Sequence, residues 1–110
     1  MRKAPNVKTA RAALGLCSLL GLLLSTSGCG GFLYGIYSGG AATKLETAQQ
    51  LGAEKYAPYE FYFAQAHLTK AMEEAATANY GDAIDLVDDA DKAAEKAITL
   101  SKQAHEGAGR

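Results

Sequence analysis

Cys29 is the residue whose type and position best suit covalent chemistry in this chain. It ends the sequence Thr26-Ser27-Gly28-Cys29, which follows an apolar stretch from Ala12 to Leu24. Four basic residues come before that stretch: Arg2, Lys3, Lys8 and Arg11. A basic start, a short apolar segment and small residues, in this order, are typical of a secretory signal peptide. The sequence therefore predicts export, with the cleavage point beside Cys29.

Residues 26–29 resemble the lipobox of bacterial lipoproteins. In that family the cysteine thiol is acylated, the peptide bond before it is cut, and the new N-terminus is acylated in turn. The resemblance implies a signal peptide over residues 1–28 and lipidation of Cys29, although the family usually has Leu where this chain has Thr26. It also implies the periplasmic face of a Gram-negative outer membrane, because Gly30 follows the cysteine where an aspartate would retain the protein at the inner membrane.

A second interpretation of the same region is a signal anchor that stays in the membrane. No charged residue occurs between Arg11 and Lys44, and about 20 apolar residues are enough to cross a bilayer. However, the uninterrupted apolar core ends at Leu24, and the Ser, Thr and Gly residues that follow are poor helix formers. Lipidation is therefore the favoured interpretation.

Charge divides the chain at the predicted cleavage point. Residues 29–110 hold seven Lys and Arg against twelve Asp and Glu, a net charge of −5. Such a surface is repelled by phosphate groups, so binding to nucleic acid is not expected. Cys17 lies in the predicted signal peptide and Cys29 is the predicted lipid carrier, so no thiol remains for a disulfide, a metal site or nucleophilic catalysis.

Residues 29–43 mix glycine with large apolar side chains. Five glycines oppose regular structure here. The interleaved apolar residues oppose a plain solvated linker, and they are Phe32, Leu33, Tyr34, Ile36 and Tyr37. Either these side chains lie at the level of the lipid head groups, where amphipathic rings are favoured, or they pack onto the domain that follows. We expect a membrane-proximal tether.

From Ala41 onward the composition is that of helices. The pattern predicts a short first helix over residues 42–56, a second over 58–78 and a third over 82–105. Pro58 either opens the second helix or kinks one long helix, and Asp82 is expected to accept the first free N–H groups of the third. The predicted fold class is all-α: an antiparallel helical hairpin of two long helices, with the short helix as an optional third. This domain spans residues 44–106 and precedes a disordered tail at 107–110.

Three- and four-residue spacings place small and apolar side chains on one face of each long helix. The second helix presents Phe61, Ala64, Leu68, Ala71, Met72, Ala75 and Ala78, and the third presents Ala83, Leu86, Val87, Ala90, Ala94, Ala97 and either Leu100 or Ser101. Alanines let two helices approach closely but bury little area each. The few large side chains must therefore supply most of the hydrophobic stabilisation, at about 1.5–3 kcal/mol for each one fully buried.

The hairpin resembles a tetratricopeptide helix pair in its small residues over 66–75, its turn Asn79-Tyr80-Gly81-Asp82 and the alanines at 90, 93 and 94. About one repeat matches, whereas stacked arrays need three or more. The lipobox followed by Ala57-Pro58-Tyr59-Glu60-Phe61 and this alanine-rich hairpin is more similar to a bacterial lipoprotein family, the domain of unknown function 4398. That resemblance implies no catalytic residues.

Residue patterns for catalysis or metal binding are sparse. His67 and His105 lie near opposite ends of the predicted hairpin without a second ligand nearby. The aspartates between Asp82 and Asp91 lack the ligand spacing and central glycine of a calcium loop. Glu73 and Glu74 would point about 100° apart on a helix. We therefore predict no catalytic residue, metal site, cofactor or small-molecule substrate, and no enzyme.

Five aromatic residues crowd into eight positions: Tyr56, Tyr59, Phe61, Tyr62 and Phe63. One helix face cannot bury all of them, so some must face the first helix, solvent or a partner. Either Tyr59, Tyr62 and Phe63 pack against residues 42–56, or they form a binding patch, since Tyr and Phe are enriched in interface cores.

These observations predict an outer-membrane lipoprotein, held to the membrane by its lipid anchor. Its small periplasmic domain is expected to be a non-catalytic protein-binding or scaffolding module with a protein partner, or to associate with itself. The alternative is a purely structural role as an oligomeric, coiled-coil-like spacer. The oligomeric state would separate the two roles.

Overall fold

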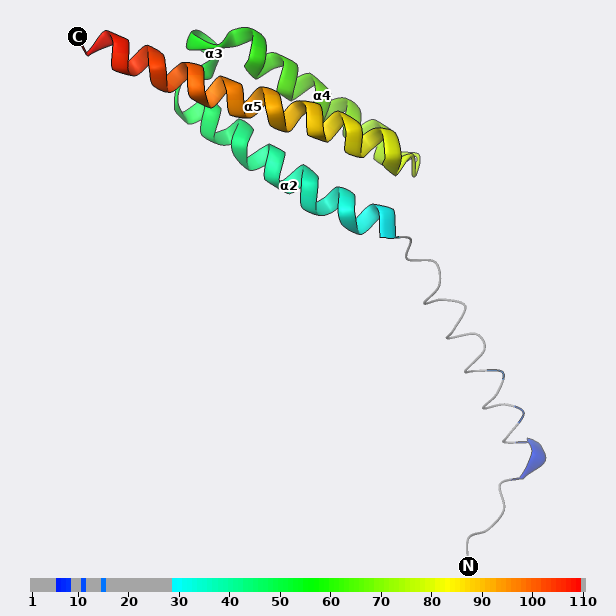
Figure 1. Cartoon of the computed structure of the whole chain (residues 1–110). Helices are drawn as coiled ribbons and strands as arrows, with labels where there is room; N and C mark the ends of the chain where they lie inside the picture. The colour runs from blue at the N-terminus through cyan, green and yellow to red at the C-terminus, as the bar shows by residue number, and fades with distance from the viewer. Residues whose placement is uncertain (1–5, 9–10, 12–14, 16–28, 110) are drawn as a thin grey trace, which may run out of the picture.

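A computed structural model of the chain describes residues 6–8, 11, 15 and 29–109 (Figure 1). Its helices between residues 29 and 109 are α2 (Cys29–Gln50), α3 (Ala53–Tyr56), α4 (Pro58–Ala76) and α5 (Tyr80–Ala108). This part of the chain contains no strand. The predicted all-α class is confirmed, and α4 and α5 form the predicted antiparallel hairpin (Figure 1).

Pro58 opens α4 at its first turn, where the missing N–H costs nothing. One of the two predicted roles of this proline is therefore confirmed. At the other end of α4, Ala78 takes a positive φ of 61°, and the backbone N–H of Asn79 donates to the carbonyl oxygen of Glu74 at 3.0 Å. This reverse turn closes the hairpin.

Helix α5 begins at Tyr80, two residues before the predicted start. Asp82 therefore lies inside the first turn, and its Oδ2 accepts a hydrogen bond from the side-chain amide of Asn79 at 2.7 Å. The prediction that Asp82 caps the backbone of this helix was wrong, because Asn79 occupies the capping position. The helix also continues to Ala108, beyond the expected domain end at residue 106.

The alanine seam between the two long helices follows the predicted spacing. Its fully buried members are Ala64, Ala71, Ala83, Val87, Ala90, Ala94 and Ala97. Ser101 continues this stripe and is buried, while Leu100 is half-buried. Met72 and Ala78 were wrongly placed in the seam: Met72 is 60 % exposed, and Ala78 is exposed beyond the end of α4. The physical reason is that Met72 lines an open groove between α4 and α2 instead of facing α5.

Helix α2 is the main departure from the expected organisation. The glycine-rich residues 29–43 were expected to resist regular structure, yet the helix begins at Cys29 and runs for 22 residues. At Gly30 a Cβ would come within 3.0 Å of the Tyr80 ring, so glycine permits a close approach of this helix to α5. Tyr34 lies against the same ring, with centroids 6.4 Å apart. Packing onto the hairpin thus overrides the low helix propensity of glycine.

The predicted first helix over residues 42–56 is interrupted. Gly52 has a φ of 76°, a conformation that suits glycine because it has no Cβ. Helix α2 therefore ends at Gln50, and the four residues Ala53–Tyr56 form the separate helix α3. This break lets the chain turn from α2 into α4.

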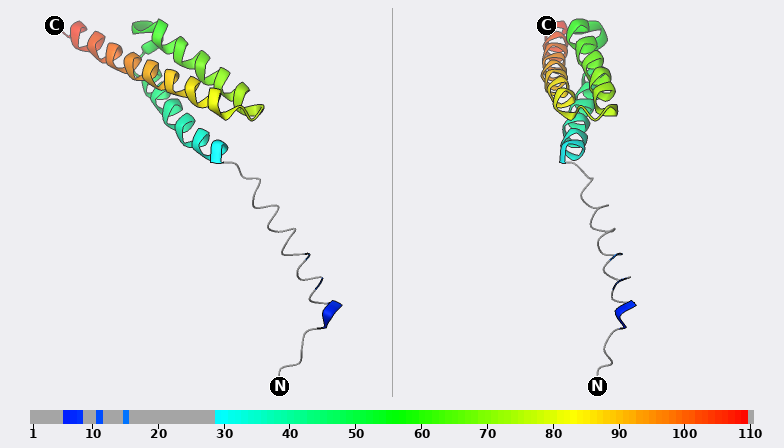
Figure 2. Two further views of the ribbon diagram at one scale, coloured as in Figure 1. Left: turned by 45° about the vertical axis from the view of Figure 1, so that its right-hand side comes forward. Right: turned by 90° about the vertical axis from the view of Figure 1, so that its right-hand side faces the viewer.

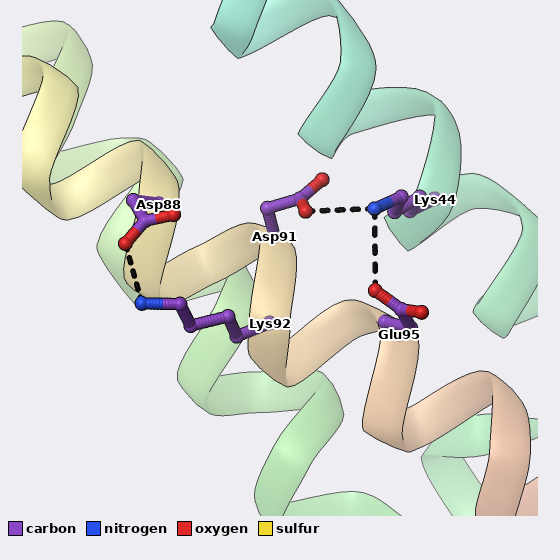
Figure 3. A network of polar contacts seen from close by, with 5 residues as sticks. All are labelled: Lys44, Asp88, Asp91, Lys92 and Glu95. Atoms are coloured by element: carbon purple, nitrogen blue, oxygen red, sulfur yellow. Dashed lines mark hydrogen bonds and ion pairs between the residues drawn. The ribbon is translucent and has the colours of Figure 1, made fainter.

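An ion-pair cluster joins α2 to α5 (Figure 3). The Nζ of Lys44 lies 2.7 Å from Oδ2 of Asp91 and 3.4 Å from Oε2 of Glu95. The hydrogen bond to Asp91 raises the pKa of Lys44 above its ordinary value. Farther along, Nε2 of His105 lies 2.9 Å from the carbonyl oxygen of Leu51. Helix α2 thus runs beside the hairpin over its whole length and completes a three-helix bundle (Figure 2).

Candidate functional site

Cys29, the predicted lipidation site, is the first residue of α2. The small residues before it, 26–28, lie outside the described part of the chain, as does nearly all of the predicted signal peptide. Cleavage and acylation therefore stay predictions. None of the helices that the structure describes is long and apolar enough to cross a membrane.

The three aromatic residues predicted to bind a partner all lie on the first turns of α4, where Tyr59 contacts Phe63 and Tyr62 contacts Phe61. Tyr59 is 72 % exposed and Tyr62 is 53 % exposed, while Phe63 is half-buried. The rings of Tyr59 and Phe63 have centroids 5.9 Å apart. Tyr62 lies edge-on against the buried ring of Phe61 at 5.2 Å. We call Tyr59, Tyr62 and Phe63 the aromatic patch.

Phe63 is held in place by His67, one turn farther along α4. Their rings are stacked with centroids 3.8 Å apart, and Nδ1 of His67 lies 3.0 Å from the backbone carbonyl oxygen of Phe63. The ring–ring contacts of Tyr59, Tyr62 and Phe63 are with other aromatic side chains of α4. They favour the binding patch over packing against residues 42–56, and both alternatives stay predictions.

A shallow groove of about 240 Å³ runs beside the patch, between α4 and α5. Tyr59 and Phe63 form an aromatic wall on α4, with Glu60 between them. The wall on α5 carries both signs of charge, from Asp89, Lys92 and Lys96. Such a surface can hold an apolar side chain against the rings and a polar group against the charges.

Glu60 and Lys96 connect the two walls of this groove. Their Oε1 and Nζ atoms are 2.9 Å apart, and the Glu60 side chain is only 14 % exposed. The hydrogen bond from Lys96 lowers the pKa of Glu60 below its ordinary value, and the same bond raises the pKa of Lys96. This pair was not predicted from the sequence, although Glu60 lies inside the aromatic cluster and Lys96 lies on the facing turn of α5.

Each histidine is engaged with a backbone carbonyl oxygen and an aromatic ring. Besides its contact with Leu51, His105 lies edge-on to Tyr56 with centroids 4.9 Å apart. His67 contacts both the backbone carbonyl oxygen and the ring of Phe63, on another part of the bundle. Within the residues described, no three His, Cys, Asp or Glu side chains are grouped so that they could hold a metal ion.

The aspartates at the start of α5 are distributed among separate partners. Asp88 pairs with Lys92 one turn along the same helix, and Asp91 pairs with Lys44 of α2 (Figure 3). Asp82 accepts from Asn79. These three aspartates therefore stabilise the start of α5 and its contact with α2.

Comparison with known proteins gives no relative for this chain. No protein-family model, no curated protein and no solved structure matches it. The resemblances to lipoproteins and to tetratricopeptide pairs therefore stay predictions from the sequence, and the geometry of the bundle carries the functional argument.

Proposed function

We propose that this protein is a lipid-anchored protein of the outer membrane whose periplasmic helical bundle binds a protein partner through the aromatic patch. The observation that carries the proposal is the exposure of Tyr59 and Tyr62 on a bundle whose seam already buries Phe61. Tyr and Phe are enriched in the cores of protein interfaces, and polar residues surround such cores as a rim.

The length of the bundle supports such a role. Helix α2 starts at Cys29, and its 22 residues span roughly 33 Å at 1.5 Å per residue. The patch lies at the start of α4, directly after α2 and α3 end. A partner bound at Tyr59 would therefore sit about 30 Å from the lipid anchor.

The proposal is tested by site-specific photocrosslinking in intact membranes. A photoreactive phenylalanine analogue replaces Tyr62, and the captured protein is identified by mass spectrometry. For the comparison of variants the analogue is placed at Phe63 instead. With this probe, the double change Tyr59→Ala with Tyr62→Ala should abolish the capture seen when Tyr59 and Tyr62 are both present, and should leave helicity intact. Met72→Ala is the matched control, because Met72 is similarly exposed on the same helix but lies outside the patch.

Three results would contradict the proposal. If Met72→Ala lowers capture as much as the double change does, the patch is not the interface. If the double change lowers helicity together with capture, the two rings serve folding. Should the only captured protein be a second copy, with a trimer or larger assembly in solution, the structural spacer would replace the binding module.

A further inference from the structure

The first half of α2 is apolar on all sides, including the side that faces away from the hairpin. No charged residue occurs between Cys29 and Thr43. Phe32 is 73 % exposed and Ile36 is 57 % exposed, and Leu33 and Tyr37 are also exposed. In globular proteins, a helix that is apolar all round is buried in protein or in lipid. Something must therefore cover this outer face.

The hairpin does not cover it. Among residues 29–43, Tyr34 and Ala41 belong to the hydrophobic cluster with Leu86 and Val87 of α5 and Leu68 and Ala71 of α4. At Gly35 and Gly39, an added Cβ would meet no atom within 4 Å. These two glycines line an open groove of about 380 Å³ that ends at Leu68 and Met72 of α4. The outer face and this groove are thus two uncovered regions of the same helix.

The chain that enters α2 indicates what covers this surface. The run without charge extends back from Thr43 to Ala12, so the apolar face begins where the predicted signal segment ends. Acylation of Cys29 and retention of an uncleaved anchor differ in chemistry, but both bring the first turn of α2 to the bilayer. Lipid is therefore the occupant that this connection favours.

Charges on α5 limit how deep the helix can enter. Asp88 and Asp91 line a pocket together with Ile36, Tyr37 and Lys44. Burying these charged groups in hydrocarbon would be costly. Contact with lipid is thus limited to a shallow insertion at the boundary between head groups and acyl chains, with the carboxylates of Asp88 and Asp91 kept on its polar side.

We propose that the first half of α2 lies in the membrane interface, with Phe32, Leu33 and Ile36 in contact with acyl chains. Tyr37 then lies at the polar boundary, as is common for tyrosine at membrane surfaces. The inference rests on the proposed membrane attachment and adds a second contact to it. With a lipid anchor alone the bundle would swivel, whereas a helix face seated in the interface fixes its orientation.

Tryptophan fluorescence tests this arrangement, because the natural chain contains no Trp. Three full-length variants each carry one probe: Phe32→Trp, Ile36→Trp and, as the matched control, Tyr62→Trp. Each is reconstituted into phosphatidylcholine vesicles with or without bromine on the acyl chains. We expect brominated lipid to quench the probes at positions 32 and 36 and to leave the probe at 62 unquenched. Acrylamide, which quenches from water, should give the reverse order.

Two quenching patterns would overturn the inference. Strong acrylamide quenching at position 36 without quenching by brominated lipid would place this face in water. Protection of position 36 from both quenchers would show that protein, such as a second copy, covers it. Flotation of the vesicles separates these failures from failure of the proposed attachment: a chain that floats but is not quenched by brominated lipid overturns only the interfacial helix, while a chain that does not float overturns both proposals.

Discussion

Ser101→Ala should stabilise the bundle, because the wild-type serine buries a hydroxyl group that has no hydrogen-bond partner. Ser101 is fully buried, and its Oγ has no hydrogen-bond partner. It lies one turn after Ala97, which is buried in a cluster of alanines with Phe61. A buried polar group without a partner costs about 1–3 kcal/mol in folding free energy.

The size of the effect follows from three contributions. Removing the unpaired hydroxyl relieves its desolvation penalty, and alanine adds a helix-propensity gain of at most about 0.7 kcal/mol. The lost oxygen forfeits dispersion contacts worth about 0.1–0.2 kcal/mol each. We expect a net gain of roughly 1 kcal/mol, which raises the melting temperature of a domain of this size by about 4–8 °C.

The assay is thermal unfolding of the full chain in detergent micelles, followed by circular dichroism at the helix band. Thr99→Ala is the matched control, because Thr99 is exposed on the same helix and its hydroxyl donates to the carbonyl oxygen of Glu95 at 3.0 Å. This control reports the change in propensity without relief of a buried group. A gain for Ser101→Ala no larger than that for Thr99→Ala would refute the reasoning, since it would show that the Ser101 hydroxyl is satisfied in solution.

Three further predictions concern the anchor, the α2 contact and pH. Cys29→Ala should leave an uncleaved precursor, and an intact mass that shows cleavage in this variant would contradict lipidation at Cys29. Gly35→Ala should stabilise α2 by about 1 kcal/mol in thermal unfolding. Gly30→Ala should stabilise it less, or destabilise it, because the added Cβ would meet the Tyr80 ring of α5 at 3.0 Å. Equal stabilisation by the two changes would show that this ring lies elsewhere. The pKa of Glu60 is lowered from 4.5 by Lys96, so its contribution to the unfolding free energy is complete above pH 4.5 and is lost as the pH falls through the folded-state pKa. Glu60→Gln should therefore melt below wild type at neutral pH and approach it in strong acid, and a difference between their melting temperatures that does not change with pH would argue against the ion pair.

The hairpin could be predicted from the sequence because its signals are local. Buried alanines repeat at three- and four-residue spacings in both long helices, and Pro58 is suited to a first helical turn. The exposure of Met72 could not be predicted from this spacing, because it depends on how α2 crosses α4. Periodicity places a residue on a helix face but does not say whether another helix covers that face.

Helix α2 could not be predicted because its stabilising contacts are distant in the sequence. Lys44 and Asp91 are separated by 47 positions, and the ring that fits against Gly30 belongs to Tyr80. Local propensity alone assigns residues 29–43 to irregular chain. The exposure of aromatic side chains on α4 could be predicted because five of them are more than one helix face can bury. The stacking of His67 on Phe63 could not be predicted and is known only from the structure.

The position of α2 in the chain also determines when the bundle can close. Synthesis proceeds from the N-terminus, so residues 29–50 exist before α5 does. Their contacts bridge 47 positions at Lys44 and 54 positions at Leu51, and a glycine-rich helix of this length is not stable alone. The α4–α5 hairpin closes through a short turn and is favoured to form first. Tyr34 and Ala41, which pack on the hairpin, are therefore uncovered until α5 is made, and this interval is when aggregation, or capture by a carrier that recognises apolar segments, competes with folding.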